Sequence, residues 1–336
     1  MSSILATHQL AVGYKTTGRT AASVVADITV TLQPGELTCL IGPNGAGKST
    51  LMRTLAGMQP PVAGRVSLGE AEIHRLPPAT LAKRLAVVLT ERIEVGNLSA
   101  YTLVALGRHP YTDWRGRLSE HDETIIRQML TTVGAAHLAA RPVSELSDGE
   151  RQKIMIARAL AQEPEVLILD EPTAFLDLPR RVETMQLLHT LAHSSGRAIL
   201  LSTHDLDLAL RMADRLWLLP TGGPLMVGLP EELALNGSLA AAFRSEGVEF
   251  DNEQGAFRVQ RHPCGPIGLT GHGPAALWTT RALERLGYEV VADHDQLPMR
   301  VHILGSNGTT RWQTTTPIRH QEHTSLAGLI EQLRAK

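Results

Sequence analysis

The sequence predicts an α/β protein with a parallel-rich sheet, followed by a small α+β domain. Three observations support this prediction. Short apolar runs alternate with helical stretches over roughly the first two thirds of the chain, a mainly helical stretch interrupts them, and the pattern changes after about residue 240. Uninterrupted apolar runs between helices are typical of strands that helices cover on both faces.

The expected strands of the first domain are compact apolar runs, each bounded by polar or glycine-containing segments. Between the second and third of them, residues about 95–165 are expected to form a helical subdomain, because apolar residues recur at helical spacing in Thr124–Val133. The five expected strands are Cys39–Ile41, Ala86–Leu89, Val166–Leu169, Ala198–Leu201 and Leu216–Leu219.

A domain boundary is predicted near residues 236–247, where Asn236-Gly237 and Ser245-Glu246-Gly247 interrupt the pattern. We therefore assign residues 1–240 to the first domain and residues 241–336 to a small accessory or regulatory domain. Its expected strands are Ala256–Gln260, Ile267–Thr270, Tyr288–Ala292 and Arg300–Leu304, and its expected helices are Pro274–Leu286 and Ser325–Leu333.

Composition excludes several classes of protein. Apolar residues make up 43% of the chain and charged residues 20%, which is typical of a globular protein rather than a disordered one. The net charge of −2 provides no basic excess for a nucleic-acid partner. No apolar run approaches the roughly 20 residues of a membrane-spanning helix, and no secretory signal is expected. Cys39 and Cys264 lie on distant segments and suggest neither a disulfide framework nor a CxxC metal site, which fits a reducing cytosol.

A phosphate-binding motif follows the first expected strand. Residues 42–49 match G-x-x-x-x-G-K-[ST] at every fixed position and lie between the strand Thr38–Ile41 and the helix Ser49–Ala56. Glycines allow successive backbone N–H groups to point at phosphate oxygens, and the helix N-terminus favours the same anion. Lys48 is expected to reach the β- and γ-phosphates, and the Ser49 hydroxyl to bind Mg²⁺. The predicted nucleotide-binding residues are Gly42, Pro43, Asn44, Gly45, Ala46, Gly47, Lys48, Ser49 and Thr50.

A second motif supplies carboxylates. The apolar run Val166–Leu169 ends in Asp170 and Glu171, and in a parallel sheet ligands bind at the carboxyl ends of strands. Asp170 is expected to hold Mg²⁺. Glu171 is placed to polarise the attacking water as a general base.

With both motifs present, the sequence resembles the ATP-binding subunits of ABC transporters over roughly residues 4–235. Residues 146–150 (Leu-Ser-Asp-Gly-Glu) resemble the LSGGQ signature of that family, with Asp148 in place of a glycine and Glu150 in place of a glutamine. The resemblance implies that Ser147, Gly149 and Glu150 contact the γ-phosphate of an ATP molecule held by a second subunit. Two ATP molecules would then lie in a head-to-tail homodimer.

Three further matches follow from the resemblance. Residues 175–177 (Phe-Leu-Asp) resemble the loop that links the two sites of the dimer. His204 resembles the histidine that contacts the γ-phosphate, and Tyr14 the aromatic residue that stacks on adenine. The family usually has a glutamine where this chain has Thr90, so the adjacent Glu91 is either a water-mediated Mg²⁺ ligand or a surface carboxylate.

Two segments resemble one branch of the family, the importers of iron–siderophore complexes, haem and cobalamin. They are Tyr101–Tyr111 and Thr173–Leu178. The resemblance implies an ATPase that uses ATP and Mg²⁺, is peripheral at the cytoplasmic face of the inner membrane, and pairs with multi-span permease subunits. A substrate-binding protein would deliver the cargo, and no nucleic acid is involved. The alternatives are a soluble ABC ATPase of a cofactor-assembly machine and an importer of another substrate.

The second domain contains six histidines but no compact metal-ligand spacing. We expect a histidine-rich accessory or dimerisation domain and assign no site there; a regulatory module that silences transport is the further alternative. The six histidines are His262, His272, His294, His302, His320 and His323.

Overall fold

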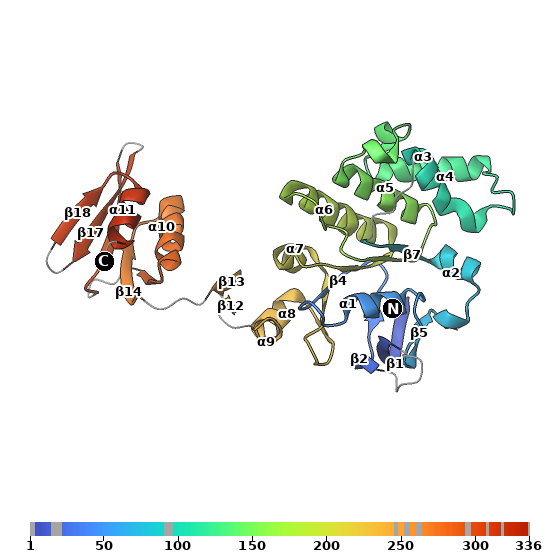
Figure 1. The fold of residues 1–336 in the computed structure, drawn as a ribbon, viewed down its shortest axis with the longest axis horizontal. Helices are drawn as coiled ribbons and strands as arrows, with labels where there is room; N and C mark the ends of the chain where they lie inside the picture. Colours follow the sequence, from blue (N-terminus) through green and yellow to red (C-terminus); the bar gives the residue numbers. More distant parts are fainter. Residues whose placement is uncertain are drawn as a thin grey trace. The chain divides into compact units, whose positions relative to one another are not determined.

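The computed structural model describes residues 4–14, 22–90, 97–244, 248–251, 256–259, 264–292, 297–306, 309–316 and 319–334. The chain divides into two compact units (Figure 1): Met1–Ser245 with Glu249–Arg258, and Glu246–Val248 with Val259–Lys336. The division lies later than the predicted 240/241 boundary. Most of a two-stranded sheet, β12 (Val248–Asp251) and β13 (Ala256–Val259), groups with the first unit rather than with the second.

The first unit contains two sheets. The smaller one is antiparallel and comprises β1 (Leu5–Tyr14), β2 (Ala22–Ile28), β3 (Thr31–Leu32), β5 (Ala63–Leu68) and β6 (Ala71–Glu72). The larger one has the order β11-β10-β4-β9-β8-β7, with parallel pairing from β10 to β7 and an antiparallel edge strand β11. Its strands are β4 (Leu37–Ile41), β7 (Leu85–Val88), β8 (Val166–Leu169), β9 (Ala198–Ser202), β10 (Arg215–Leu218) and β11 (Met226–Gly228). The predicted α/β fold is therefore confirmed.

The strands of the larger sheet are apolar on both faces because each face packs on its own core. Leu167 and Leu169 of β8 belong to one hydrophobic cluster, whereas Val166 and Ile168 belong to the other. This alternation is what successive residues of a strand produce. Helix α1 (Lys48–Leu55) packs within the second cluster, between the two sheets. The other helices of the unit are α2 (Pro78–Arg84), α3 (Ala100–Ala105), α4 (Glu120–Thr132), α5 (Asp148–Leu160), α6 (Leu178–Ser195), α7 (Leu206–Met212), α8 (Pro230–Leu235) and α9 (Ser238–Ala242).

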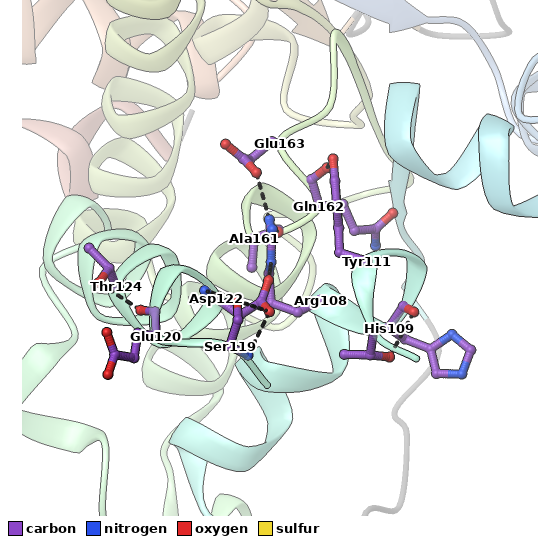
Figure 2. Close-up of polar contacts among 11 residues, drawn as sticks. Arg108, His109, Tyr111, Ser119, Glu120, Asp122, Thr124, Ala161, Gln162 and Glu163 are labelled. Carbon is purple, nitrogen blue, oxygen red and sulfur yellow. Dashed lines mark hydrogen bonds and ion pairs between the residues drawn. The ribbon is translucent and has the colours of Figure 1, made fainter. Parts of the chain in front are cut away.

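Helices α3, α4 and α5 form the helical subdomain and lie together in Figure 1. A buried arginine joins them (Figure 2). Arg108, in the 3₁₀ helix η2 (Leu106–Tyr111), donates from Nε to Asp122 Oδ1 of α4 at 2.8 Å. Its Nη1 donates to the Ala161 carbonyl at the end of α5 at 2.8 Å and to Glu163 Oε2 at 2.7 Å. Arg108 lies within the segment from which we inferred the importer branch, and in the structure its role is to hold α4 and α5 together.

The same segment contacts the rest of the first unit. The guanidinium of Arg108 stacks over the Tyr111 ring, 3.9 Å from its centroid, and Lys83 of α2 lies 4.7 Å from the same centroid. Tyr111 also donates from its hydroxyl to the Gln162 carbonyl at 2.9 Å (Figure 2). The backbone of η2 approaches α5 closely at Gly107, where the residue has no side chain. A Cβ there would lie 2.2 Å from the Arg158 carbonyl oxygen. Tyr111 therefore connects the helical subdomain to α2 through the cation–π contact with Lys83.

The second unit is a sheet of order β15-β14-β16-β17-β18, in which β14 pairs in parallel with β15 and β16. Its core lies between this sheet and two helices. The elements are β14 (Pro266–Thr270), α10 (Gly273–Arg285), β15 (Glu289–Ala292), β16 (Arg300–Ser306), β17 (Thr309–Thr316), β18 (Arg319–His323) and α11 (Leu326–Arg334). Strands β17 and β18 are additions that the sequence analysis did not predict.

Within the described residues, no helix combines the length and the apolar character needed to cross a membrane. Both cysteines are free; Cys39 is buried in β4, and Cys264 is exposed at the start of the second unit.

Candidate functional site

Two glycines of the loop after β4, Gly42 and Gly47, lie where a side chain would clash with a neighbouring residue. A Cβ on Gly42 would lie 2.1 Å from the carbonyl oxygen of Leu219. Gly47 has φ 103° and leads directly into α1, and a Cβ there would lie 2.8 Å from Val24 Cγ1. The loop is therefore closely packed and leads into the N-terminus of a helix, where backbone N–H groups can bind phosphate.

Lys48 lies inside this loop. Its Nζ donates to the carbonyl oxygens of Gly42 and Pro43, at 2.8 Å and 3.0 Å. Burial lowers the pKa of the Lys48 ammonium, and the nearby carboxylates of Glu171 and Asp170 oppose that shift. The lysine is thus a buried cation held by the carbonyls that precede it, at the place where an anionic ligand would be most stabilising.

The carboxylates at the end of β8 are held by the neighbouring strand β9. Ser202 Oγ donates to Asp170 Oδ1 at 2.6 Å and accepts the Glu171 N–H at 2.9 Å. Glu171 has φ 48°, so the chain turns sharply where its carboxylate leaves the sheet. His204 Nε2 lies 2.8 Å from Glu171 Oε1. Sequence analysis missed Ser202, although a polar residue at the carboxyl end of a strand beside β8 was the signal that could have found it.

A pocket of about 320 Å³ brings most of the predicted residues together. The hydroxyl of half-exposed Tyr14 lies 3.1 Å from Thr50 Oγ1 at this pocket. Gly42 and Ala46 are buried and do not line this pocket, and neither does Asp170, which accepts a hydrogen bond from Ser202. The lining residues are Tyr14, Val24, Asn44, Gly45, Gly47, Lys48, Ser49, Thr50, Glu171 and His204.

An adjoining pocket of about 150 Å³ shares Glu171 and His204 with the first and adds residues that sequence analysis did not single out. Among these, Arg181 of α6 lies 3.5 Å from Asp205 and also donates from Nε to the Leu176 carbonyl at 2.8 Å. The side chains around the Glu171 carboxylate therefore extend to the start of α6, which follows the predicted loop at residues 175–177.

The signature residues Ser147, Gly149 and Glu150 do not line the phosphate pocket of their own chain. Instead they begin helix α5 with a capping box. Ser147 Oγ accepts the Glu150 N–H at 3.3 Å, and Glu150 Oε2 accepts the Ser147 N–H at 2.9 Å. The N–H and the hydroxyl of Ser147 both donate to Glu150 Oε2, and these two bonds, with Arg141 at 3.2 Å, lower the pKa of Glu150. The substituted glutamate therefore carries its charge and stabilises the helix start.

Of the two residues at the position where the family usually has a glutamine, the structure describes Thr90. Thr90 Oγ1 donates to the backbone carbonyl of Asp170 at 2.6 Å, so this residue contacts the acidic strand end through its hydroxyl. Glu91 lies outside the described residues, and its role as a Mg²⁺ ligand stays a prediction.

Four of the six C-terminal histidines are described. His302, His320 and His323 each lie within hydrogen-bond distance of a threonine hydroxyl, whereas His272 precedes α10. His262 and His294 lie outside the described residues. In the part of the second unit that the structure describes, no three ligand side chains come close enough to hold a metal ion.

Comparison with known proteins identifies the chain. Residues 25–174 match the family model of the ABC transporter, and residues 264–334 match the model of the iron ABC transporter C-terminal domain. An uncharacterized ABC transporter ATP-binding protein of Methanocaldococcus jannaschii is 42% identical over 293 residues, covering 87% of this chain and 99% of the relative. The chain belongs to the ABC transporter ATP-binding proteins. Proteins of this kind are ATPases whose hydrolysis of ATP is coupled to transport.

Other relatives of this ABC ATPase have named cargo. An iron(3+)-hydroxamate import ATP-binding protein of Bacillus subtilis is 37% identical over 240 residues, which cover 71% of this chain and 87% of the relative. A cobalamin import ATP-binding protein of Halobacterium salinarum is 36% identical over 275 residues, covering 80% of this chain and 69% of the relative. The predicted family branch, with its additional C-terminal domain, is thereby confirmed.

Solved structures of ABC transporter proteins share the fold of the first unit. A putative metal-chelate type ABC transporter in an inward-facing conformation matches with a TM-score of 0.62 and 26% identity, covering 72% of this chain and 89% of that chain. A dimeric bacterial ABC transporter cassette matches with a TM-score of 0.58 and 25% identity, covering 67% of this chain and 98% of that chain.

Proposed function

We propose that this ABC ATPase energises import of an iron chelate, a ferric siderophore, across the cytoplasmic membrane. The observation that carries the proposal is the match of residues 264–334 to a C-terminal domain named for iron ABC transporters. The 37% identical relative named for iron(3+)-hydroxamate import supports the same cargo class. The proposal does not require the ATPase to contact the cargo. The cargo class is inferred from the accessory unit and from the relatives.

The loop and its lysine bind the phosphates of ATP in this proposal. The N–H groups around Gly45 and Gly47 face the phosphate oxygens, and Lys48 exchanges its carbonyl partners for the β- and γ-phosphates. Tyr14 offers the exposed aromatic face on which adenine stacks. The burial of Lys48 and the steric need for glycine at residue 47 support this assignment.

The donor set beside the loop fits Mg²⁺. Ser49 presents a hydroxyl at the pocket, and Asp170 presents a carboxylate whose Oδ1 is already fixed by Ser202. Hydroxyl and carboxylate oxygens are ligands that Mg²⁺ prefers. When bound, the ion neutralises charge on the β- and γ-phosphates. Ser49 and Asp170 are the residues that would hold it, and Glu91 remains a further candidate.

Hydrolysis then depends on the pair Glu171 and His204. Glu171 orients the attacking water and accepts a proton from it at the carboxylate. Ser202 Oγ holds the backbone of Glu171 in place by accepting the Glu171 N–H. His204 lies 2.8 Å from Glu171 Oε1, so its imidazole is close enough to the same centre to contact the γ-phosphate. Lys48 and His204 stabilise the negative charge of the phosphoryl group, which lowers the activation barrier of ATP hydrolysis.

A homodimer completes the site in this proposal. Ser147, Gly149 and Glu150 lie away from the pocket of their own chain, so they serve the ATP of a second copy. The N-terminus of α5 favours an anion there, and Ser147 supplies the hydroxyl. The dimeric cassette among the structural relatives supports this arrangement.

Permease subunits are the second class of partner. An apolar pocket of about 490 Å³ lies between the core and the helical subdomain, and half-exposed Met58 borders it. In the proposal it receives a cytoplasmic segment of the permease, which holds the ATPase peripherally at the cytoplasmic face. A substrate-binding protein delivers cargo from outside.

The test is uptake of labelled ferric hydroxamate siderophore by cells whose chromosomal copy is replaced. Native protein is compared with Glu171→Gln, which keeps the volume but cannot accept a proton, and with Glu123→Gln, an exposed glutamate on α4 as the matched control. The proposal expects uptake to fall to background for Glu171→Gln only, at equal protein level. Equal uptake in all three strains would refute it.

Cobalamin is the second candidate cargo, and one observation favours it. The relative named for cobalamin import aligns over 275 residues, a span longer than the ATP-binding unit alone. Labelled cobalamin in the same strains separates the two cargoes, and haem is tested in the same way. The alternative of a cofactor-assembly ATPase predicts that no multi-span membrane protein co-purifies with the native chain.

A further inference from the structure

One cluster of metal-ligating side chains lies outside the nucleotide site. His189 and His193 are four residues apart on α6, so they lie on the same face of the helix in its last two turns. Asp214 directly precedes β10 and approaches the same face. Ligand atoms of the three residues all lie within 4.8 Å of one another. It is the one such group among the residues that the structure describes.

We propose that His189, His193 and Asp214 bind a divalent transition-metal ion, for which Zn²⁺ is the best-suited probe. Two imidazole nitrogens and one carboxylate oxygen form a donor set that suits this class of metal, and three protein ligands leave one position of a tetrahedron for water. The inference does not depend on the proposed cargo, because no residue of the cluster lines the ATP pocket.

The geometry is close to that of a bound site. Ligands about 2.0–2.2 Å from a Zn²⁺ ion lie roughly 3.3 Å from one another in a tetrahedron. His193 Nε2 already lies 3.1 Å from both carboxylate oxygens of Asp214. The rings of His189 and His193 are 4.3 Å apart between centroids and tilted by 35°. Because His193 is exposed and His189 is half-buried, small side-chain rotations suffice to bring all three donors around one ion.

The carboxylate is held by the backbone. Leu37 N, at the start of β4, donates to Asp214 Oδ2 at 2.7 Å. Such a contact outside the ligand shell fixes the orientation of a ligand and raises metal affinity. An ion pair between His193 and Asp214 at the end of a helix would account for two of the three residues. It does not account for His189, which has a ligand atom within 4.8 Å of those of the other two residues.

A bound ion would connect two elements that lead to the active site. Helix α6 begins at Leu178, immediately after the loop at residues 175–177, and Asp177 of that loop caps it. Strand β4 runs from Leu37 towards the phosphate loop. Since the cluster is at the opposite end of both elements from the phosphates, we expect the ion to stabilise their packing and not to be required for hydrolysis.

The experiment uses the full chain after treatment with a chelator. Zn²⁺ stoichiometry and affinity are measured by competition with a chromophoric chelator, and Co²⁺ is added separately to record its visible absorption. The variants are His189→Gln, His193→Gln, the double variant and Asp214→Asn. Asn keeps an oxygen that can accept the Leu37 N–H. The matched control is His121→Gln, an exposed histidine on α4.

The proposal expects the double variant to bind one Zn²⁺ equivalent fewer than native protein, and each single variant to bind roughly tenfold or more weakly at this site. Zn²⁺ should raise the Tm of native protein and of His121→Gln but not of the double variant. Circular dichroism verifies that the variants are folded. Unchanged stoichiometry and Tm response in the folded double variant would place the bound Zn²⁺ elsewhere and overturn the proposal, as would native protein that binds no Zn²⁺.

Discussion

Replacing Arg108 by methionine tests how the helical subdomain is held together. Methionine matches the aliphatic stem of arginine but lacks the guanidinium and its charge, so the substitution removes the bonds to Asp122, Ala161 and Glu163 while keeping the apolar stem. Asp122 would retain the N–H and hydroxyl of Ser119, at 2.9 Å and 2.6 Å, but the Ala161 carbonyl would lose its side-chain partner.

The expected magnitude follows from burial. The side chains of Arg108 and Asp122 are 2% and 7% exposed, and removing one partner of a buried pair costs about 3–5 kcal/mol. Because Ser119 still serves Asp122 and Glu163 is 38% exposed, we expect the lower end, about 3 kcal/mol. The matched control is Arg127→Met, whose pair with Glu123 is 72% and 48% exposed and is expected to contribute less than about 1 kcal/mol.

Hydrogen exchange measured on the full chain is the appropriate assay, because a two-unit protein need not unfold in a single step. A loss of about 3 kcal/mol would accelerate exchange of the α4 and α5 amides roughly 100-fold, since 1.4 kcal/mol is a factor of ten. Arg108→Lys should fall between native and Arg108→Met, because an ammonium lacks the fork that reaches three acceptors. If Arg108→Met and Arg127→Met exchange alike, the reasoning is wrong.

Three further predictions follow from single contacts. Gly107→Ala should destabilise the protein by about 3 kcal/mol, because overpacking is costly and its Cβ would lie 2.2 Å from the Arg158 carbonyl oxygen, whereas Gly305→Ala, which meets nothing within 4 Å, should leave the Tm nearly unchanged. Glu150→Gln should lower the KM for ATP, because in the proposed dimer it removes a negative charge near the γ-phosphate of the ATP held by the second copy and keeps the capping box; an unchanged or higher KM would contradict this. Burial raises the pKa of Asp122, but hydrogen bonds from its serine partner and from the buried arginine outweigh this and hold it at about 2, below 3.8 in the unfolded chain. Its stabilising contribution is therefore present above about pH 4 and lost as the pH falls towards 2, so acid unfolding of the Asp122→Asn variant should be less steep over that window than that of native protein.

Much of the fold could be predicted because its signals are local. Val166–Leu169 was expected as a strand and is β8 over the same residues, because burial on both faces makes the run wholly apolar. The helix expected at Pro274–Leu286 is α10, shifted by one residue at each end. Strands β17 and β18 were missed because they are rich in threonine and charged residues, and their stability comes from pairing with each other and with β16.

The sequence by itself determined the phosphate loop, the acidic strand end and the family, because each is a contiguous motif whose chemistry depends on residues that are neighbours in the chain. Only the tertiary structure decided which side chains serve those motifs from a distance. Ser202 reaches Asp170 because β9 pairs with β8, and Asp214 reaches His193 because β10 lies beside β4 under the end of α6. Such contacts are set by strand order and helix packing, which bring together residues that the sequence keeps apart.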